Sequence, residues 1–292
     1  MRNHLFSLLL FSSVLATAQT QQNIHKNTGT VSTIITTIDS IRFTGSFTIM
    51  EVILQDGTVA SHAISDIINV NFITANQDSC LATNVFNPNV SYGQLVDQEG
   101  NVYKTISIGS QEWMAENLKA SIYRNGDVIA TNLIDSEWPI ANDSNIGAWA
   151  YYNNNSLYNC PYGKLYNWSA VNDSRNVCPA GWHVPSDAEW ATLSAYLVND
   201  SLTGGKLKSS GLDYWISPNL DASNESGFSS LPGGARFAGG IYSEMGYSGY
   251  WWSATEYATD FAWGRMLSYD SGLIQINGSS GQVGCSVRCV MD

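Results

Sequence analysis

The stretch CPAGWHVPSDAEWATLSAYL, residues 178–197, carries the clearest local structural signal of the chain. Ser186 and Glu189 have the spacing of a capping box, in which the serine hydroxyl accepts from the Glu189 backbone N–H and the glutamate carboxylate accepts from the Ser186 N–H. The large apolar residues that follow fall at positions i, i+3 and i+7, on one helical face: Trp190, Leu193 and Leu197. The spacing therefore predicts a helix over about 187–197 that is capped by Ser186 and packs against a core.

The same stretch places His183 close to two acids, which raises the alternative of a catalytic or metal-binding cluster. Histidine metal sites commonly take a second ligand a few residues away, but the other histidines after residue 18 are His25 and His62. Asp187 and Glu189 both suit a helix N-terminus, where the helix dipole favours negative charge. We therefore expect a hydrogen-bonded, partly buried His183, and we assign no catalytic residue and no metal ligand.

The N-terminus has the pattern of a secretory signal. Arg2 supplies a positive start, residues 5–15 form an apolar run, and Ala16-Thr17-Ala18 is a small-x-small cleavage site. We expect residues 1–18 to be removed and the protein to be secreted or exposed at the cell surface. No later stretch is apolar enough to form a transmembrane helix.

The charge balance argues against nucleic acid as a partner. The chain has 13 Lys and Arg against 25 Asp and Glu, and loss of Arg2 with the signal would leave a formal charge of −13. Such a protein repels phosphate backbones. Charged residues make up only 13% of the chain, about half the usual share, which suits a neutral polar surface outside the cell.

Residues 19–76 contain an internal repeat. The sequence Gly-Thr-Val occurs at 29–31 and again at 57–59, and an Ile-x-x-Ile/Val-x-Phe pattern ends each unit at 38–43 and 67–72. Glycine turns followed by alternating β-branched residues are typical of strands. We predict a small all-β unit of two similar hairpins here, a linker over 77–94 and a larger domain over 95–292.

The larger domain begins with a predicted hairpin. NVYKTISIGSQEWM, residues 101–114, has two alternating runs on either side of Gly109-Ser110, which suits a two-residue turn. Residues 120–165 are rich in Asn, Tyr and Gly and show little periodicity. Because disordered segments are usually poor in aromatic residues, we expect long ordered loops there.

Five cysteines in an exported chain predict disulfides and leave at least one cysteine over. Cys285 and Cys289 lie four residues apart in a probable strand, so their Cα atoms would be about 13 Å apart, beyond the roughly 7 Å that a disulfide allows. Each needs a distant partner. We favour Cys178–Cys289 and, as the second pair, Cys160–Cys285, which leaves Cys80 over.

Several motifs of the larger domain occur together in one order between residues 100 and 290: GNVYKTISIGSQEWMAENLK, YGKLYNWSAV, CPAGWHVPSDAEW, GGKLK, NESGFSSLPGGARF, GYWWSATE and SVRCV. This set resembles the Fibrobacter succinogenes major paralogous domain, a module of exported proteins of Bacteroidetes and Fibrobacteres. The N-terminal repeat is similar to the β segment at the start of many exported Bacteroidetes proteins.

The resemblance implies an α+β, C-type-lectin-like fold with twisted antiparallel sheets, one or two helices and long loops. It extends more distantly to the formylglycine-generating sulfatase-modifying enzymes, whose helix start is similar to VPSDAEW. Those enzymes need a reactive cysteine pair upstream of their last motif, whereas residues 247–284 contain no cysteine. The calcium signatures of C-type lectins are also missing, so the resemblance brings neither an activity nor a cofactor.

The candidate ligand-binding residues are aromatic. Aromatic rings stack on sugars and anchor protein interfaces, but large aromatics also dominate protein cores. YWWSAT alternates like a strand, so Trp251 and Trp252 would face opposite sides and one of them should lie in the core. The candidates for the binding face are Tyr214, Trp215, Tyr242, Tyr247, Trp252 and Trp263.

These observations favour a non-enzymatic binding module that recognises a glycan or a surface protein through aromatic-rich loops, in the manner of an adhesion protein. The alternatives are a divergent enzyme, of the formylglycine-generating or carbohydrate-hydrolase type, and a purely structural envelope protein. A glycosidase needs two carboxylates about 5–10 Å apart. Glu225, Glu244 and Glu256 lie near aromatic residues in the sequence, and backbone hydrogen bonding or a solvated surface also explains them.

Overall fold

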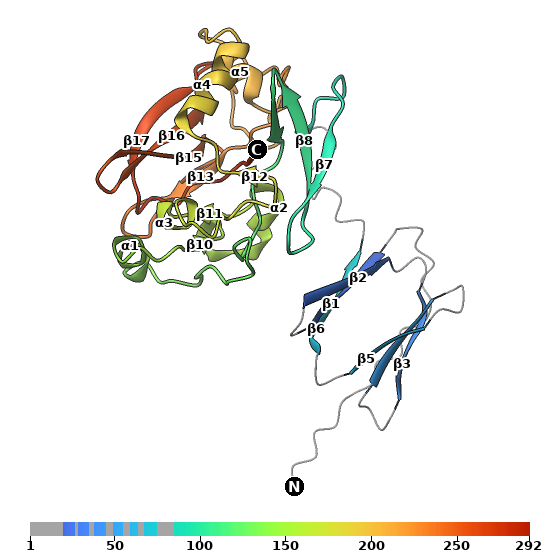
Figure 1. Ribbon diagram of the computed structural model, residues 1–292. Coiled ribbons are helices and arrows are strands. Elements are labelled where there is room, and N and C mark those ends of the chain that lie inside the picture. Colours follow the sequence, from blue (N-terminus) through green and yellow to red (C-terminus); the bar gives the residue numbers. More distant parts are fainter. Residues whose placement is uncertain are drawn as a thin grey trace. The chain divides into compact units, whose positions relative to one another are not determined.

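The structure is a computed structural model that describes residues 20–26, 29–34, 38–44, 49–54, 59–63, 67–74 and 85–292. The chain forms two compact units, Met1–Asp78 and Ser79–Asp292 (Figure 1). The predicted signal over 1–18 and Cys80 lie outside the described residues. Within the described part of the chain, no helix has the length and apolar character needed to cross a bilayer.

The first unit is built from strands over its described residues, as predicted. They are β1 (Thr20–Lys26), β2 (Gly29–Ile34), β3 (Ile38–Thr44), β4 (Ile49–Leu54), β5 (Val59–Ala63) and β6 (Ile67–Thr74). The expected pair of hairpins is wrong in its arrangement, because the strands form two three-stranded antiparallel sheets, β2-β1-β6 and β3-β4-β5. A third strand pairs more backbone groups than a lone hairpin can, and a lone hairpin is marginally stable.

The first sheet of the second unit has the order β12-β18-β9-β8-β7. Its strands are β7 (Gly93–Val96), β8 (Val102–Ile108), β9 (Gln111–Met114), β12 (Trp182–His183) and β18 (Val290–Met291). The hairpin predicted around Gly109-Ser110 is confirmed, since Ile108 pairs with Gln111 across a two-residue turn. Gly109 has a φ of +64°, which glycine adopts at little cost.

The second sheet has the order β14-β13-β15-β16-β17. Its strands are β13 (Gly233–Arg236), β14 (Tyr242–Met245), β15 (Ser248–Ala258), β16 (Phe261–Ser268) and β17 (Gln275–Ser280). The β13–β15 pair is parallel and the others are antiparallel. A two-stranded sheet joins β10 (Trp149–Ala150) to β11 (Leu165–Tyr166).

The helices of the second unit are short, apart from α4, and they connect long loops. They are α1 (Glu137–Asp143), η4 (Tyr152–Asn154), η5 (Ser156–Tyr158), α2 (Asn159–Tyr162), α3 (Trp168–Val171), α4 (Asp187–Tyr196) and α5 (Thr203–Leu207). Helix α4 lies against β15, where the Trp190 indole N–H donates to the Trp252 carbonyl at 3.4 Å. The second unit is therefore a mixed α+β domain built mostly of sheet.

Two buried clusters make up most of the core. One gathers Tyr103, Met114, Tyr166 and Trp252 with their neighbours, and the other gathers Trp113, Trp190, Phe228 and Trp251. Val85 and Phe86, which are 1% and 7% exposed, belong to the second cluster. These two residues belong to the segment predicted as a linker over 77–94, and their side chains pack in the core of the second unit.

The Cys178–Cys289 disulfide is confirmed, with Cα atoms 6.0 Å apart and a sequence separation of 111. The predicted Cys160–Cys285 pair is wrong. Cys285 is a free, buried thiol, and Cys160 is disulfide-bonded elsewhere. Backbone hydrogen bonds in both directions hold Cys285 against Tyr166 inside the core, at 2.8 and 3.1 Å. The segment around Cys285 makes isolated bridges, and regular pairing resumes only at β18.

Candidate functional site

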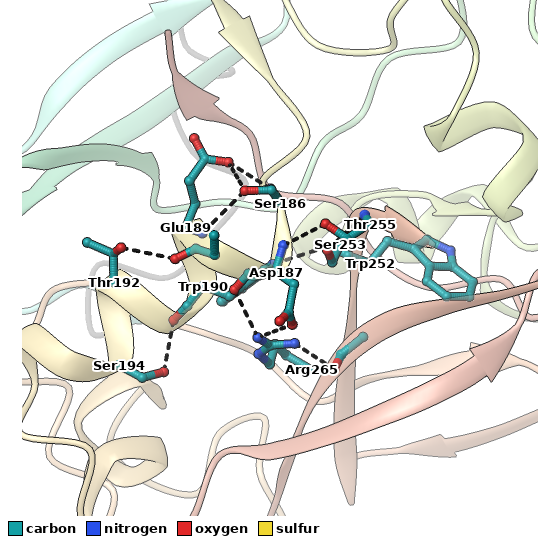
Figure 2. A network of polar contacts seen from close by, with 12 residues as sticks. Ser186, Asp187, Glu189, Trp190, Thr192, Ser194, Trp252, Ser253, Thr255 and Arg265 are labelled. Carbon is teal, nitrogen blue, oxygen red and sulfur yellow. Dashed lines mark hydrogen bonds and ion pairs between the residues drawn. The ribbon is translucent and has the colours of Figure 1, made fainter. Parts of the chain in front are cut away.

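The predicted capping box is present at the start of α4 (Figure 2). The Glu189 N–H donates to Ser186 Oγ at 3.3 Å, and Glu189 Oε2 accepts from the Ser186 N–H at 2.7 Å and from its hydroxyl at 2.7 Å. The helix runs over Asp187–Tyr196, and the predicted apolar face is buried: Trp190, Leu193 and Leu197 are 1%, 0% and 7% exposed. The carboxylate that could have marked a catalytic cluster therefore closes a helix N-terminus.

Asp187, in the first turn, ties α4 to the second sheet. Its carboxylate accepts from the Arg265 guanidinium of β16 at 2.6 Å, and its backbone N–H donates to Thr255 Oγ1 of β15 at 2.9 Å (Figure 2). The Arg265 side chain is 1% exposed. A buried guanidinium needs a charged or hydrogen-bonded partner, so this contact fixes the position of α4 on the sheet.

The structure brings His183 and Glu189 together. His183 Nε2 lies 2.7 Å from Glu189 Oε1, and His183 Nδ1 lies 2.6 Å from Asp292 Oδ1. Burial disfavours the charged imidazole, but the hydrogen bonds to Asp292 and Glu189 outweigh it and raise the pKa of His183 above its ordinary value of 6.5. For Glu189, burial is likewise outweighed by hydrogen bonds from Ser186 and His183, which lower its pKa.

This arrangement suits a structural role for His183 better than a role in proton transfer. Both ring nitrogens of His183 are engaged by carboxylates, and Ser186 Oγ is bonded to Glu189 rather than to the imidazole. A general base needs a nitrogen that can reach the proton it abstracts. Among the described residues, no group of three or more His, Cys, Asp or Glu side chains is placed to hold a metal ion.

Tyrosines from separate segments of the second unit form a continuous row. Ring contacts run from Tyr242 to Tyr152, Tyr158, Tyr162 and Tyr214, with centroid distances of 5.4, 5.6, 6.3 and 6.0 Å. The rings meet edge-to-face or tilted, which is the favoured geometry for aromatic pairs. All five are half-buried. We call these five residues the tyrosine row.

The tyrosine row is held in place by hydrogen bonds and by a glycine. The Tyr242 hydroxyl donates to Asn154 Oδ1 at 2.8 Å. Gly234, with a φ of +64°, leaves room for Tyr152, since a Cβ there would lie 2.9 Å from its ring. Burial raises the pKa of Tyr162 and of Tyr242 to about 12. The hydroxyls of Tyr162 and Tyr242 therefore stay protonated and can both donate and accept.

Exposed apolar side chains accompany the tyrosine row. Leu157 lies in η5 between two of its members and is 77% exposed, and Ile241, next to Tyr242, is 66% exposed. Ile216 follows Tyr214 closely and is 41% exposed; its N–H donates to the Gly246 carbonyl, beside Tyr247. The segments that carry the row thus also expose apolar side chains close to it in the sequence.

The predicted binding residues divide into four accessible positions and two core positions. Tyr214 and Tyr242 are the two ends of the tyrosine row, Tyr247 is 45% exposed and packs on Tyr269, and Trp263 is half-buried against Tyr257 at 4.4 Å. Trp215 and Trp252 are wrong as surface residues, because they are 1% and 0% exposed. Their indole N–H groups donate to the carbonyls of Ser230 and Tyr166, which satisfies them inside the core.

Sequence reasoning missed Tyr152, Tyr158 and Tyr162, the middle of the tyrosine row. They lie in the aromatic, asparagine-rich loop segment, where no periodicity indicates which way a side chain points. The signal available was composition: tyrosines at short intervals among Asn and Ser, in a segment that is ordered without regular structure.

The fold and site define a mixed α+β domain with two five-stranded sheets and a tyrosine row carried by loops, short helices and the start of β14. The family model of the Fibrobacter succinogenes major domain matches residues 106–291. The chain belongs to this family, as its motifs indicated. Comparison of this chain with the curated proteins and with the solved structures found no match.

Proposed function

We propose that the second unit is a non-enzymatic binding module, exported to the cell surface or beyond, which engages an extracellular partner through the tyrosine row. The observation that carries this proposal is the row itself, in which three half-buried tyrosines of residues 152–162 make ring contacts with Tyr214 and Tyr242. Leu157 and Ile241, which neighbour row members in the sequence, are exposed. Half-buried tyrosines lose little conformational entropy on binding and supply apolar area with a polar tip.

A protein partner fits this surface better than a glycan. Sugars stack on free ring faces, whereas the edge-to-face contacts of the tyrosine row use ring faces internally. Exposed aliphatic side chains such as Leu157 and Ile216 add area that suits an apolar protein patch. A glycan remains the alternative ligand of the same surface, and the acidic chain makes nucleic acid an unsuitable one.

The C-type-lectin-like architecture is part of the same proposal. It is supported by two mostly antiparallel sheets, few helices and long aromatic loops. In such a scaffold the sheets and the disulfide supply rigidity, and loops supply recognition. Neither a metal ion nor a cofactor is part of the proposal.

The test compares the chain from residue 19 with the double variant Tyr152→Ser/Tyr242→Ser. Both are immobilised, exposed to solubilised surface proteins of the source cells and, separately, to a glycan array with and without calcium. We expect a protein that is retained by the parent chain and lost with the double variant. The matched control is Tyr257→Ser, which removes a 55% exposed tyrosine outside the row. Equal retention by all three chains would contradict the proposal, and row-dependent array binding would replace the protein partner with a glycan.

A further inference from the structure

A recess separate from the tyrosine row lies among β8, the end of α4, α5 and the segment before β7. Its volume is about 560 Å³, within the roughly 300–1,000 Å³ of small-ligand sites. None of the described residues that line it belongs to the tyrosine row or to the His183 contacts. The recess is therefore an independent candidate for ligand binding.

The floor of the recess is apolar and its wall is aromatic. Ile106, Ile108 and Leu197 are 5%, 2% and 7% exposed and form the floor. Tyr196 lines the recess and is 63% exposed. Its ring lies over Gly109, where an added Cβ would come within 2.8 Å of the ring. The Tyr196 ring, which is otherwise open to solvent, therefore packs against the turn at Gly109 because this residue has no side chain.

Lys206 brings unused hydrogen-bond donors to the recess. Its ammonium donates to the Leu197 carbonyl at 2.9 Å. The nearest carboxylate oxygens, of Glu225 and Asp200, are 3.7 and 3.8 Å away, beyond direct hydrogen-bonding distance. An ammonium has three donors, so donors remain for a ligand although the Lys206 side chain is only 15% exposed.

The remaining polar groups are acceptors or hydroxyls. The Glu225 side chain is 58% exposed, and Ser91, Ser107 and Ser226 also line the recess. With Glu225 and Asp200 both near Lys206, the local charge is negative overall, which disfavours an anionic ligand. A neutral ligand that offers both donors and acceptors matches this mixture of groups.

We propose that this recess binds a neutral pyranose residue, with one sugar face on Tyr196 and hydroxyl groups at Lys206 and Glu225. Pyranoses combine an apolar C–H face with a rim of hydroxyls, each of which can donate and accept. The recess provides the matching aromatic ring, apolar floor, ammonium donor and carboxylate acceptor. This site does not depend on the tyrosine row, so each proposal can fail alone.

The experiment is saturation-transfer difference NMR on the chain from residue 19. The probes are methyl α-D-mannopyranoside, methyl β-D-galactopyranoside and N-acetyl-D-glucosamine, with D-glucuronate as the anionic comparison. We expect millimolar binding of at least one neutral sugar, weaker binding of glucuronate, and a loss of at least about tenfold in affinity with Tyr196→Ala. Glu225→Ala should weaken binding of the same sugar, and the row variant Tyr242→Ala should leave this binding unchanged.

Gly109→Ala provides a second variant with the tyrosine intact. The new methyl group would displace the Tyr196 ring, so sugar binding should fall while far-ultraviolet circular dichroism stays that of the parent chain. The proposal is overturned if none of the three neutral sugars binds in the millimolar range, or if a bound sugar is insensitive to both Tyr196→Ala and Glu225→Ala. Sensitivity to Tyr242→Ala instead would move the sugar site to the tyrosine row.

Discussion

Trp251 and Trp252 are consecutive residues of β15, yet their rings are buried in the two different clusters of the core. The Trp251 indole N–H donates to Asn117 Oδ1 at 2.9 Å, and that of Trp252 donates to the Tyr166 carbonyl at 2.8 Å. Because side chains alternate along a strand, β15 separates the two clusters and is packed on both faces. The prediction that one of the two tryptophans lies in the core understated their burial.

Replacing Trp252 should therefore destabilise the second unit strongly. Trp252→Phe removes part of a fully buried ring and its hydrogen bond, at a cost of about 2–4 kcal/mol in the free energy of unfolding. Urea denaturation measures this value. The control is Tyr257→Phe on the same strand, which removes only the hydroxyl of a 55% exposed ring and should change stability by less than about 0.5 kcal/mol. Similar losses in both variants would contradict the packing described for β15.

The capping box should contribute measurably to stability. Ser186→Ala leaves the Glu189 N–H without its acceptor and should cost about 1 kcal/mol. Glu189→Ala should cost more, because it also removes the contact with His183. Thermal unfolding of the two variants and of Thr192→Ala, an exposed position of α4 outside the cap, gives the comparison. The prediction fails if Thr192→Ala is as destabilising as Ser186→Ala.

The contacts of His183 predict a pH dependence. Because the pKa of His183 is raised in the folded state, this residue contributes stability that is complete below about pH 6.5 and is lost as the pH rises through the folded-state pKa. Because the pKa of Glu189 is lowered, Glu189 contributes stability that is present above about pH 4.5 and is lost as the pH falls through its folded-state pKa. The stability difference between the parent chain and His183→Gln should thus be largest at about pH 5–6 and smaller at about pH 9. Urea denaturation across this range checks it, and a constant difference would show that the imidazole charge has no part in stability.

The Cys178–Cys289 disulfide closes a loop with a sequence separation of 111. In the chain-entropy model such a crosslink stabilises by up to about 4–5 kcal/mol. The double variant Cys178→Ala/Cys289→Ala should lose a large part of this stabilisation, and a lower urea midpoint would measure the loss. Cys285→Ala serves as the control, since it removes a thiol without a crosslink. A double variant as stable as the control would contradict a stabilising crosslink.

Cys285 should be inert in the folded protein. It is 3% exposed, and burial raises the pKa of its thiol far above the ordinary value, so little reactive thiolate is present. Iodoacetamide should leave Cys285 unmodified in buffer and alkylate it in denaturant, as read by peptide mass spectrometry. Modification at equal rates in both conditions would show that the thiol is accessible and the surrounding core open.

Local signals of the sequence were sufficient wherever a feature depends on near neighbours in the chain. The capping box at Ser186 and Glu189, the α4 face and the turn at Gly109-Ser110 all involve residues within about two helical turns or one hairpin, and all are confirmed. The Cys178–Cys289 pair was the long-range exception. Excluding a Cys285–Cys289 bond required only that each cysteine pair with a distant partner, and Cys178 was the favoured partner of Cys289. The favoured partner of Cys285 was wrong, because Cys285 is a free, buried thiol.

Tertiary structure alone decided which aromatic side chains reach the surface. Trp215 and Tyr214 are adjacent, yet one is in the core and the other ends the tyrosine row. Tyr152 and Tyr242 meet although they are far apart in sequence. The sequence by itself determined the family, the local helix and turn chemistry and the α+β character. Loop aromatics carry no period, so only the packing of distant segments determined where their rings lie and which of them reach the surface.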